Sequence, residues 1–64
     1  MYDKRLDTFV TIAELGSFSK AADILYLSVP ALTKQISALE KEYGFTLFTR
    51  DARGAHLTKA GLSL

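Results

Sequence analysis

The stretch Ser28–Gly44 reads SVPALTKQISALEKEYG and contains a beginning, an apolar face and an end for one helix. Ser28 is a residue type that caps free backbone N–H groups, and Pro30 falls in the first turn, where its missing N–H costs nothing. Gly44 can adopt the left-handed conformation in which many helices end. The apolar side chains recur at helical spacing, at Leu32, Ile36, Leu39 and Tyr43. The stretch therefore predicts a capped helix with one stripe of side chains in a core.

The opposite face of this helix is small, polar and cationic. At about 100° per residue, it carries Pro30, Lys34, Ser37, Ala38 and Lys41, with Thr33 at its margin. Because this face has no large apolar group and no carboxylate, it has the size and chemistry to enter a DNA major groove. An ordinary solvated helix surface is the alternative interpretation of Thr33, Lys34 and Ser37.

Length and composition limit the possible classes of protein. The chain has 64 residues, 48% of them hydrophobic and 23% charged, which predicts one small globular domain. The absence of cysteine excludes a disulfide framework and a thiolate metal site. No apolar run approaches the roughly 18–20 residues of a membrane span, so we expect a cytoplasmic protein with no membrane partner.

An enzyme is the least supported class. The sequence has no phosphate-binding glycine loop and no nucleophile with a matching base, and so short a chain has little room for a substrate cleft. His56 is the single histidine and has no second ligand at a suitable spacing. We therefore expect no catalytic residue, no metal and no cofactor.

The net charge of +1 is small, but the cations are unevenly placed. Residues 45–64 carry Arg50, Arg53 and Lys59 against the single carboxylate of Asp51. The basic bias therefore follows the long helix, which predicts a directed cationic surface of modest strength.

The segment from about Asp3 to Leu15 predicts a first amphipathic helix that ends before Gly16. Its stripe consists of Leu6, Phe9, Val10 and Ala13. Ile12 and Leu15 fall beside that stripe, so they are either additional core or part of a subunit contact.

A second helix is expected from Ser19, as its cap, to about Leu25. The small Ala21 and Ala22 allow another helix to approach closely, while Ile24 and Leu25 supply the apolar side chains. Only residues 26–28 separate it from the long helix, and two helices joined by so short a turn are typical of a helix-turn-helix unit.

The residues after Gly44 predict a small β-hairpin. Residues 45–50 are rich in aromatic and β-branched residues, and Asp51–Gly54 has Asp and Gly at the positions that a type I turn favours. Residues 55–58 form the returning strand, with Arg53 at the tip. Thr58 then caps a further helix of barely two turns, so we expect the protein to continue beyond Leu64.

These features together resemble the N-terminal DNA-binding domain of LysR-type transcriptional regulators, from about Leu6 to the last residue. The resemblance is carried by a spaced series: Ala21-Ala22, Leu25, Ser28, Pro30-Ala31-Leu32-Thr33, Ile36, Leu39-Glu40, Gly44, Leu47-Phe48, Arg50, Leu57-Thr58 and Ala60-Gly61. It implies a mostly α fold: a winged helix-turn-helix with a three-helix core and a β-hairpin wing in residues 1–58, and the start of a linker helix in residues 59–64.

The resemblance also implies partners. The family binds double-stranded DNA and pairs as a homodimer, or as a dimer of dimers, through the linker helix and the first helix. By this analogy, the subunit-contact interpretation of Ile12 and Leu15 is strengthened. A small-molecule co-inducer would bind a C-terminal domain that this chain does not contain.

The family positions that contact bases correspond here to Val29, Pro30, Thr33 and Lys34, with Ser37 further along the same face and Arg53 of the wing in the minor groove. Val29 stands where a glutamine is common, which replaces a bidentate adenine contact with a methyl contact. Lys34 replaces a frequent arginine, a planar fork, with a point charge. We therefore expect DNA binding with a different preferred site.

Three further positions, and Arg53 itself, allow two interpretations each. Ser17 and Lys20 either contact DNA phosphates or only serve the start of the second helix, and Arg53 is otherwise a solvated turn residue. Arg50 contacts phosphate or pairs with Glu40, whose carboxylate lies near a helix C-terminus and needs a cation. A winged helix whose outer face binds another protein is the main alternative function.

Overall fold

The computed structural model describes residues 4–63. The expected helix start at Asp3 and the last expected linker residue, Leu64, lie outside the described residues. Within them, the elements follow in this order: α1 (Lys4–Leu15), α2 (Phe18–Leu25), α3 (Val29–Tyr43), β1 (Phe48–Asp51), β2 (Gly54–Leu57) and α4 (Lys59–Leu62).

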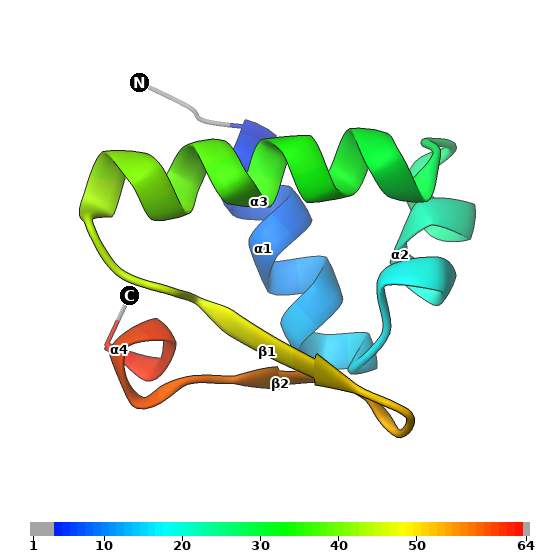
Figure 1. The fold of residues 1–64 in the computed structure, drawn as a ribbon. Coiled ribbons are helices and arrows are strands. Elements are labelled where there is room, and N and C mark those ends of the chain that lie inside the picture. Colours follow the sequence, from blue (N-terminus) through cyan, green and yellow to red (C-terminus); the bar gives the residue numbers. More distant parts are fainter. Residues whose placement is uncertain (1–3, 64) are drawn as a thin grey trace.

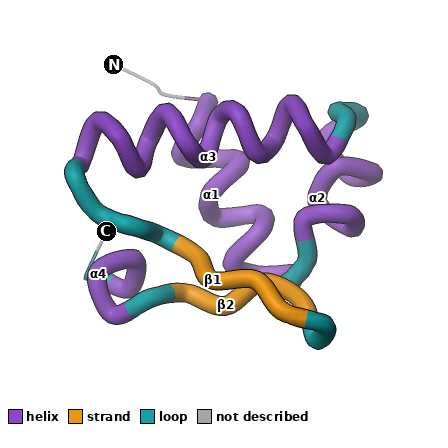
Figure 2. The backbone as a smooth tube through the Cα atoms, in the orientation of Figure 1, coloured by secondary structure: helices purple, strands orange, loops and turns teal. Residues whose placement is uncertain are grey.

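The three long helices surround one core, and the hairpin closes it from below. In Figure 1, α3 runs across the top, α1 crosses beneath it, and α2 packs at the N-terminal end of α3. Strands β1 and β2 pair antiparallel, with Phe48 opposite Leu57 and Asp51 opposite Gly54. Figure 2 shows that short loops join these elements. The mostly α, winged helix-turn-helix architecture expected from the sequence is confirmed.

Local residue chemistry sets the ends of α3 as expected. Ser28 Oγ accepts a hydrogen bond from the Ala31 N–H (3.2 Å), and Pro30 lies in the first turn. Gly44 adopts a left-handed φ of +82° and donates its N–H to Glu40 O (2.8 Å). Because both ends are satisfied by adjacent residues, the helix boundaries need little help from the rest of the fold.

The start of α2 differs from the prediction. The cap is Ser17, not Ser19, and Ser17 Oγ accepts from the Lys20 N–H (3.2 Å). The helix therefore begins at Phe18, two residues earlier. Both serines are good caps, but an earlier start buries the large Phe18 ring in the core, which the later start would place in a loop.

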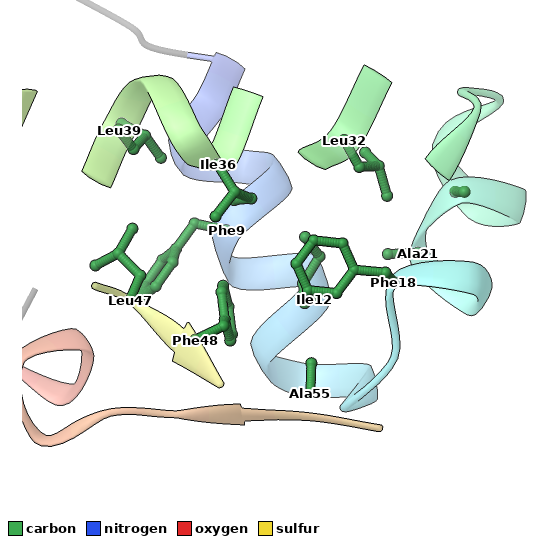
Figure 3. Packing of buried hydrophobic residues seen from close by; sticks show 11 residues of the cluster. Phe9, Ile12, Phe18, Ala21, Leu32, Ile36, Leu39, Leu47, Phe48 and Ala55 are labelled. Carbon is green, nitrogen blue, oxygen red and sulfur yellow. The ribbon is translucent and has the colours of Figure 1, made fainter. Parts of the chain in front are cut away.

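The core lies between α1, α2, α3 and the hairpin (Figure 3). The expected α3 stripe is buried at Leu32, Ile36 and Leu39. Tyr43 was predicted to be in the core but is 42% exposed, and its ring stacks near Phe45 with centroids 6.3 Å apart. Tyr43 therefore packs at the edge of the core, against Phe45, and not inside it.

Helix α1 is rotated relative to the prediction. Leu6 and Val10, expected in the stripe, are exposed, whereas Ile12 is completely buried and Leu15 packs against the core. Ile12 is therefore a core residue and not a subunit contact. The rotation also buries Thr8, whose hydroxyl donates to Gln35 Oε1 on α3 (2.6 Å).

Helix α2 packs through its small residues. Ala21 and Ala22 are buried, as expected for a close approach of helices, and Leu25 packs against the core. Ile24, predicted to contribute apolar packing, is instead 57% exposed and is not part of the core. The short turn after α2 contains Tyr26 in a left-handed conformation, with φ of 56°.

The wing is attached directly to the turn between α1 and α2. Ala55 N–H donates to Gly16 O (3.0 Å). Next to this bond, Gly54 has φ of +129°, and a Cβ built on it would lie 2.3 Å from Gly16 O. On the inner side, the Phe48 ring meets Phe9 and Phe18, with centroids 5.4 and 5.8 Å apart. The hairpin is therefore part of the core.

Helix α4 is attached at Leu47. Thr58 N–H donates to Leu47 O (3.0 Å), and Thr58 Oγ1 accepts from Gly61 N–H (2.9 Å), which makes Thr58 the predicted cap. A Cβ on Gly61 would lie 2.5 Å from Leu47 O. The helix thus leaves the domain in a direction that backbone contacts determine.

Candidate nucleic-acid interface

The N-terminal half of α3 presents the predicted polar face outward. Pro30, Lys34 and Ser37 are exposed, and Thr33 is half-buried. Lys34 forms no ion pair with any residue between 4 and 63. Val29 differs from its neighbours because it is partly buried and packs against the core, which leaves only part of its side chain for a contact outside the protein.

The wing presents Arg53 at its tip. Residues Ala52 and Arg53 form the two-residue connection between β1 and β2, and both are exposed. The Arg53 backbone N–H donates to Asp51 Oδ1 (2.8 Å), which holds the turn. The expected hairpin with Arg53 at its tip is therefore confirmed, although its strands cover Phe48–Asp51 and Gly54–Leu57 and not the predicted residues 45–50 and 55–58.

A contact that the sequence pattern did not predict lies on the outer face of the wing. His56 Nε2 is 3.1 Å from Asp51 Oδ1. Gly54 lies opposite Asp51, so His56 is the diagonal neighbour on the same face of the hairpin. Side chains alternate between the two faces of a strand, so pairing of Asp51 with Gly54 places Asp51 and His56 on the same face. The predicted turn could therefore have indicated this contact.

The contribution of the Asp51 carboxylate to the stability of the turn depends on pH. The Arg53 backbone N–H, and then the His56 side chain, lower the pKa of Asp51 below its ordinary value of 3.8. A folded-state pKa below the unfolded one means that the carboxylate stabilises the turn above the ordinary pKa and loses this effect as the pH falls through the lowered value. We expect the Arg53 amide resonance to titrate with a midpoint below pH 3.8.

An Asp51→Asn variant is the control for that NMR titration, because it cannot ionise and should leave the Arg53 amide unchanged over the same range. A midpoint at or above 3.8 in the parent protein would contradict the assigned hydrogen bonds.

Several predicted residues come together in a groove between α2 and the wing. The groove has a volume of about 390 Å³. Its basic and hydroxyl side chains are those of Ser17, Ser19, Lys20, Arg50 and Arg53. Residues 17–20 and 50–53 thus line one groove, although residues 21–49 separate them in the chain. Ser17 is also the cap of α2, so its structural role is confirmed.

Of the two interpretations of Arg50, the ion pair with Glu40 is wrong. It does not pair with Glu40, because Glu40 Oε2 instead accepts the backbone N–H of Leu47 (2.8 Å). The guanidinium carbon of Arg50 lies 4.1 Å from the centroid of the Phe18 ring, a cation–π contact. Glu40 is thus a structural residue that holds the start of the wing, and Arg50 faces the groove.

The three parts of this surface lie on one side of the molecule. In Figure 1, the N-terminal end of α3, helix α2 and the tip of the wing are all on the right, while the C-terminal end of α3 and α4 are on the left. Among residues 4–63, no three histidine or acidic side chains are grouped so that they could hold a metal ion. No helix in this range is long and apolar enough to cross a membrane.

Comparison with known proteins adds a family to this geometry. Residues 4–62 match the family described as bacterial regulatory helix-turn-helix protein, lysR family. The chain is 50% identical to the transcriptional regulator TfdT of Cupriavidus pinatubonensis, over 91% of this chain and 25% of TfdT. It is 52% identical to AbaB of Streptomyces antibioticus, over 88% of this chain and 19% of AbaB. The chain therefore spans a quarter or less of these two regulators.

Solved structures are similar as well. A complex of the CbnR DNA-binding domain with DNA matches with a TM-score of 0.90 and 40% identity, over 98% of this chain and 72% of that one. A complex of the BenM DNA-binding domain with catB site 1 DNA matches with a TM-score of 0.89 and 40% identity, over 98% and 71%.

Proposed function

Because the chain belongs to the LysR family of bacterial regulatory helix-turn-helix proteins, we propose that it binds double-stranded DNA sequence-specifically and regulates transcription. Residues 1–58 are the DNA-binding domain, and residues 59–64 begin the linker helix. The observation that carries the proposal is the exposed polar face of α3, which lies on the same side of the molecule as the Arg53 wing tip and the start of α2.

Each part of this surface has its own role in the proposed complex. The N-terminal half of α3 enters the major groove, where Thr33, Lys34 and Ser37 address base edges or phosphates. Pro30 and the exposed part of Val29 lie against the groove floor. Arg53 enters the adjacent minor groove, where the negative potential is strong. Ser17, Lys20 and Arg50 contact the phosphate backbone, which positions the protein.

Assembly is part of the proposal. The family resemblance implies a homodimer or dimer of dimers through the linker helix and α1, in a protein whose further C-terminal domain binds a small-molecule co-inducer in the cytoplasm. On α1, the apolar side chains left for a subunit contact are Leu6 and Val10, in place of the buried Ile12. Most of this dimer contact requires a linker helix several turns longer than α4 from each subunit.

Sedimentation tests this assembly. We expect the 64-residue chain to sediment mainly as a monomer, whereas a chain extended by about thirty residues of linker helix, roughly 45 Å, sediments as a dimer. A stable dimer of the short chain would refute the proposed role of the linker.

Substitution of the two exposed cations tests the DNA interface. We expect Lys34→Ala and Arg53→Ala each to weaken binding to a selected duplex by about 1–3 kcal/mol if each contacts a base. Fluorescence anisotropy at several salt concentrations measures both the affinity and its salt dependence. Lys59→Ala, which removes an exposed cation on α4 at the other side of the molecule, is the matched control.

Salt also separates DNA binding from the alternative of a protein-binding winged helix. Affinity for DNA falls steeply as salt rises because bound phosphates release counterions, whereas an apolar protein contact does not weaken in this way. If both variants bound DNA like the parent protein, the assigned residues would be wrong.

A further inference from the structure

Arg50 rests on an aromatic ring that cannot move freely. Phe18 is 5% exposed and is the first residue of α2. Its ring packs edge-on against Phe48, with an interplanar angle of 77°, and Phe48 in turn packs against Phe9. Figure 3 shows these rings converging in the core. The guanidinium of Arg50, at 4.1 Å from the Phe18 centroid, therefore lies on a platform that the core holds in place.

This contact leaves the hydrogen-bonding edge of Arg50 available. The contact places the guanidinium carbon of Arg50 over the ring face, and a guanidinium has five N–H donors to offer to other groups. The Arg50 side chain forms no hydrogen bond or ion pair with residues 4–63. Glu40, the carboxylate expected to pair with it, is engaged by Leu47.

The groove around Arg50 favours an anion. Lys20 lines it from α2, and Arg50 and Arg53 line it from the wing. The one carboxylate in the lining, Asp51, is engaged by the Arg53 backbone N–H and His56. A planar guanidinium matches the oxygens of a phosphate group in a bidentate manner.

We propose that Phe18 is the residue that positions Arg50 for the contact with a backbone phosphodiester of the DNA that the proposed function assigns to Arg50. The proposal rests on the proposed function and adds to it a residue that positions one phosphate contact. One phosphate held between α2 and the wing fixes the position of the DNA backbone relative to the recognition face of α3 and to Arg53. The aromatic platform holds the guanidinium in place before DNA arrives, which reduces the ordering that binding requires.

The test uses a labelled mixed-sequence duplex of about 30 base pairs at low salt, where sequence-independent phosphate contacts dominate affinity. We expect Arg50→Met to weaken binding about tenfold and to lower the slope of log affinity against log salt by about one. Arg50→Lys keeps the charge and so keeps the slope, but it loses about threefold in affinity because it lacks the planar fork. Lys59→Met is the matched control, and it should change neither the affinity nor the slope.

A double-mutant cycle tests the role of Phe18. Phe18→Leu keeps an apolar side chain and removes the ring, and we expect it to weaken binding about two- to fivefold when Arg50 is present. In the Arg50→Met background it should have no further effect. Circular dichroism establishes that each variant is folded at the temperature of the measurement. If Phe18→Leu does not fold, the slopes of the two Arg50 variants still decide whether Arg50 contacts phosphate.

Three outcomes would overturn the proposal. One is an unchanged salt slope in Arg50→Met, which would mean that Arg50 touches no phosphate. Another is an equal loss from Phe18→Leu in both backgrounds, which would mean that Phe18 acts only through the core. The third is a loss in Lys59→Met as large as that in Arg50→Met, which would reflect net charge alone. Failure of the parent protein to bind the duplex would instead refute the proposed function.

Discussion

Replacement of Gly54 by alanine is expected to destabilise the domain by about 2–4 kcal/mol and to detach the wing from the α1–α2 turn. Two effects add. A side chain at φ of +129° is strained, and its Cβ would lie 2.3 Å from Gly16 O, a backbone atom that cannot rotate away. Relief of that clash separates the strands from the turn and breaks the Ala55 N–H to Gly16 O bond.

Urea unfolding followed by far-ultraviolet circular dichroism measures this loss. Gly44→Ala is the matched control, because Gly44 also has a positive φ, of +82°, but nothing lies within 4 Å of a Cβ there. It should cost only the backbone strain, roughly 1–2 kcal/mol. Equal losses in the two variants would show that the contact between Gly54 and Gly16 contributes nothing.

Detachment of the wing also has a consequence for DNA binding. Arg50 and Arg53 both lie in the hairpin that the Gly16 contact holds against α2. A folded Gly54→Ala protein should therefore bind DNA more weakly, and Arg53→Ala should cost less in this background than in the parent. The two changes are not independent, because one displaces the residue that the other removes.

The largest expected loss of stability comes from Ile12→Ala. Ile12 has no exposed surface, and truncation of such a side chain costs about 2–5 kcal/mol. A domain of this size has a reserve of only about 3–5 kcal/mol, so a large fraction of the variant should be unfolded at room temperature. Thermal and urea unfolding measure the loss.

Val10→Ala is the matched control on the same helix. Val10 is 48% exposed, so its truncation should cost less than about 1 kcal/mol. The apolar spacing of the sequence alone predicts the opposite order, because it places Val10 in the stripe and Ile12 beside it. The stability losses of the two variants therefore decide whether α1 packs as the apolar spacing predicts or as the structure shows. A larger loss of stability from Val10→Ala than from Ile12→Ala would contradict the structure.

Part of the candidate DNA interface could be predicted from nearby residues in the sequence, and part depends on the tertiary structure. The polar face of α3 was predictable because helical geometry alone places Lys34 and Ser37 opposite Leu32 and Ile36. The Arg53 tip was predictable because Asp51 and Gly54 specify the turn between them. The cation–π contact of Arg50 was not, because it depends on how the wing docks against α2.

The sequence by itself determined the features that adjacent residues control: the caps at Ser28 and Thr58, the left-handed end at Gly44 and the turn from Asp51 to Gly54. Each depends on hydrogen bonds or backbone preferences within a few positions of the chain. Only the tertiary structure decided that Ile12 is buried while Val10 is not, that Glu40 binds Leu47, and that Arg50 lies over Phe18. Those outcomes depend on how several elements pack together against α1 and α2. The residues next to an apolar or charged side chain in the sequence do not indicate which distant residue it will contact.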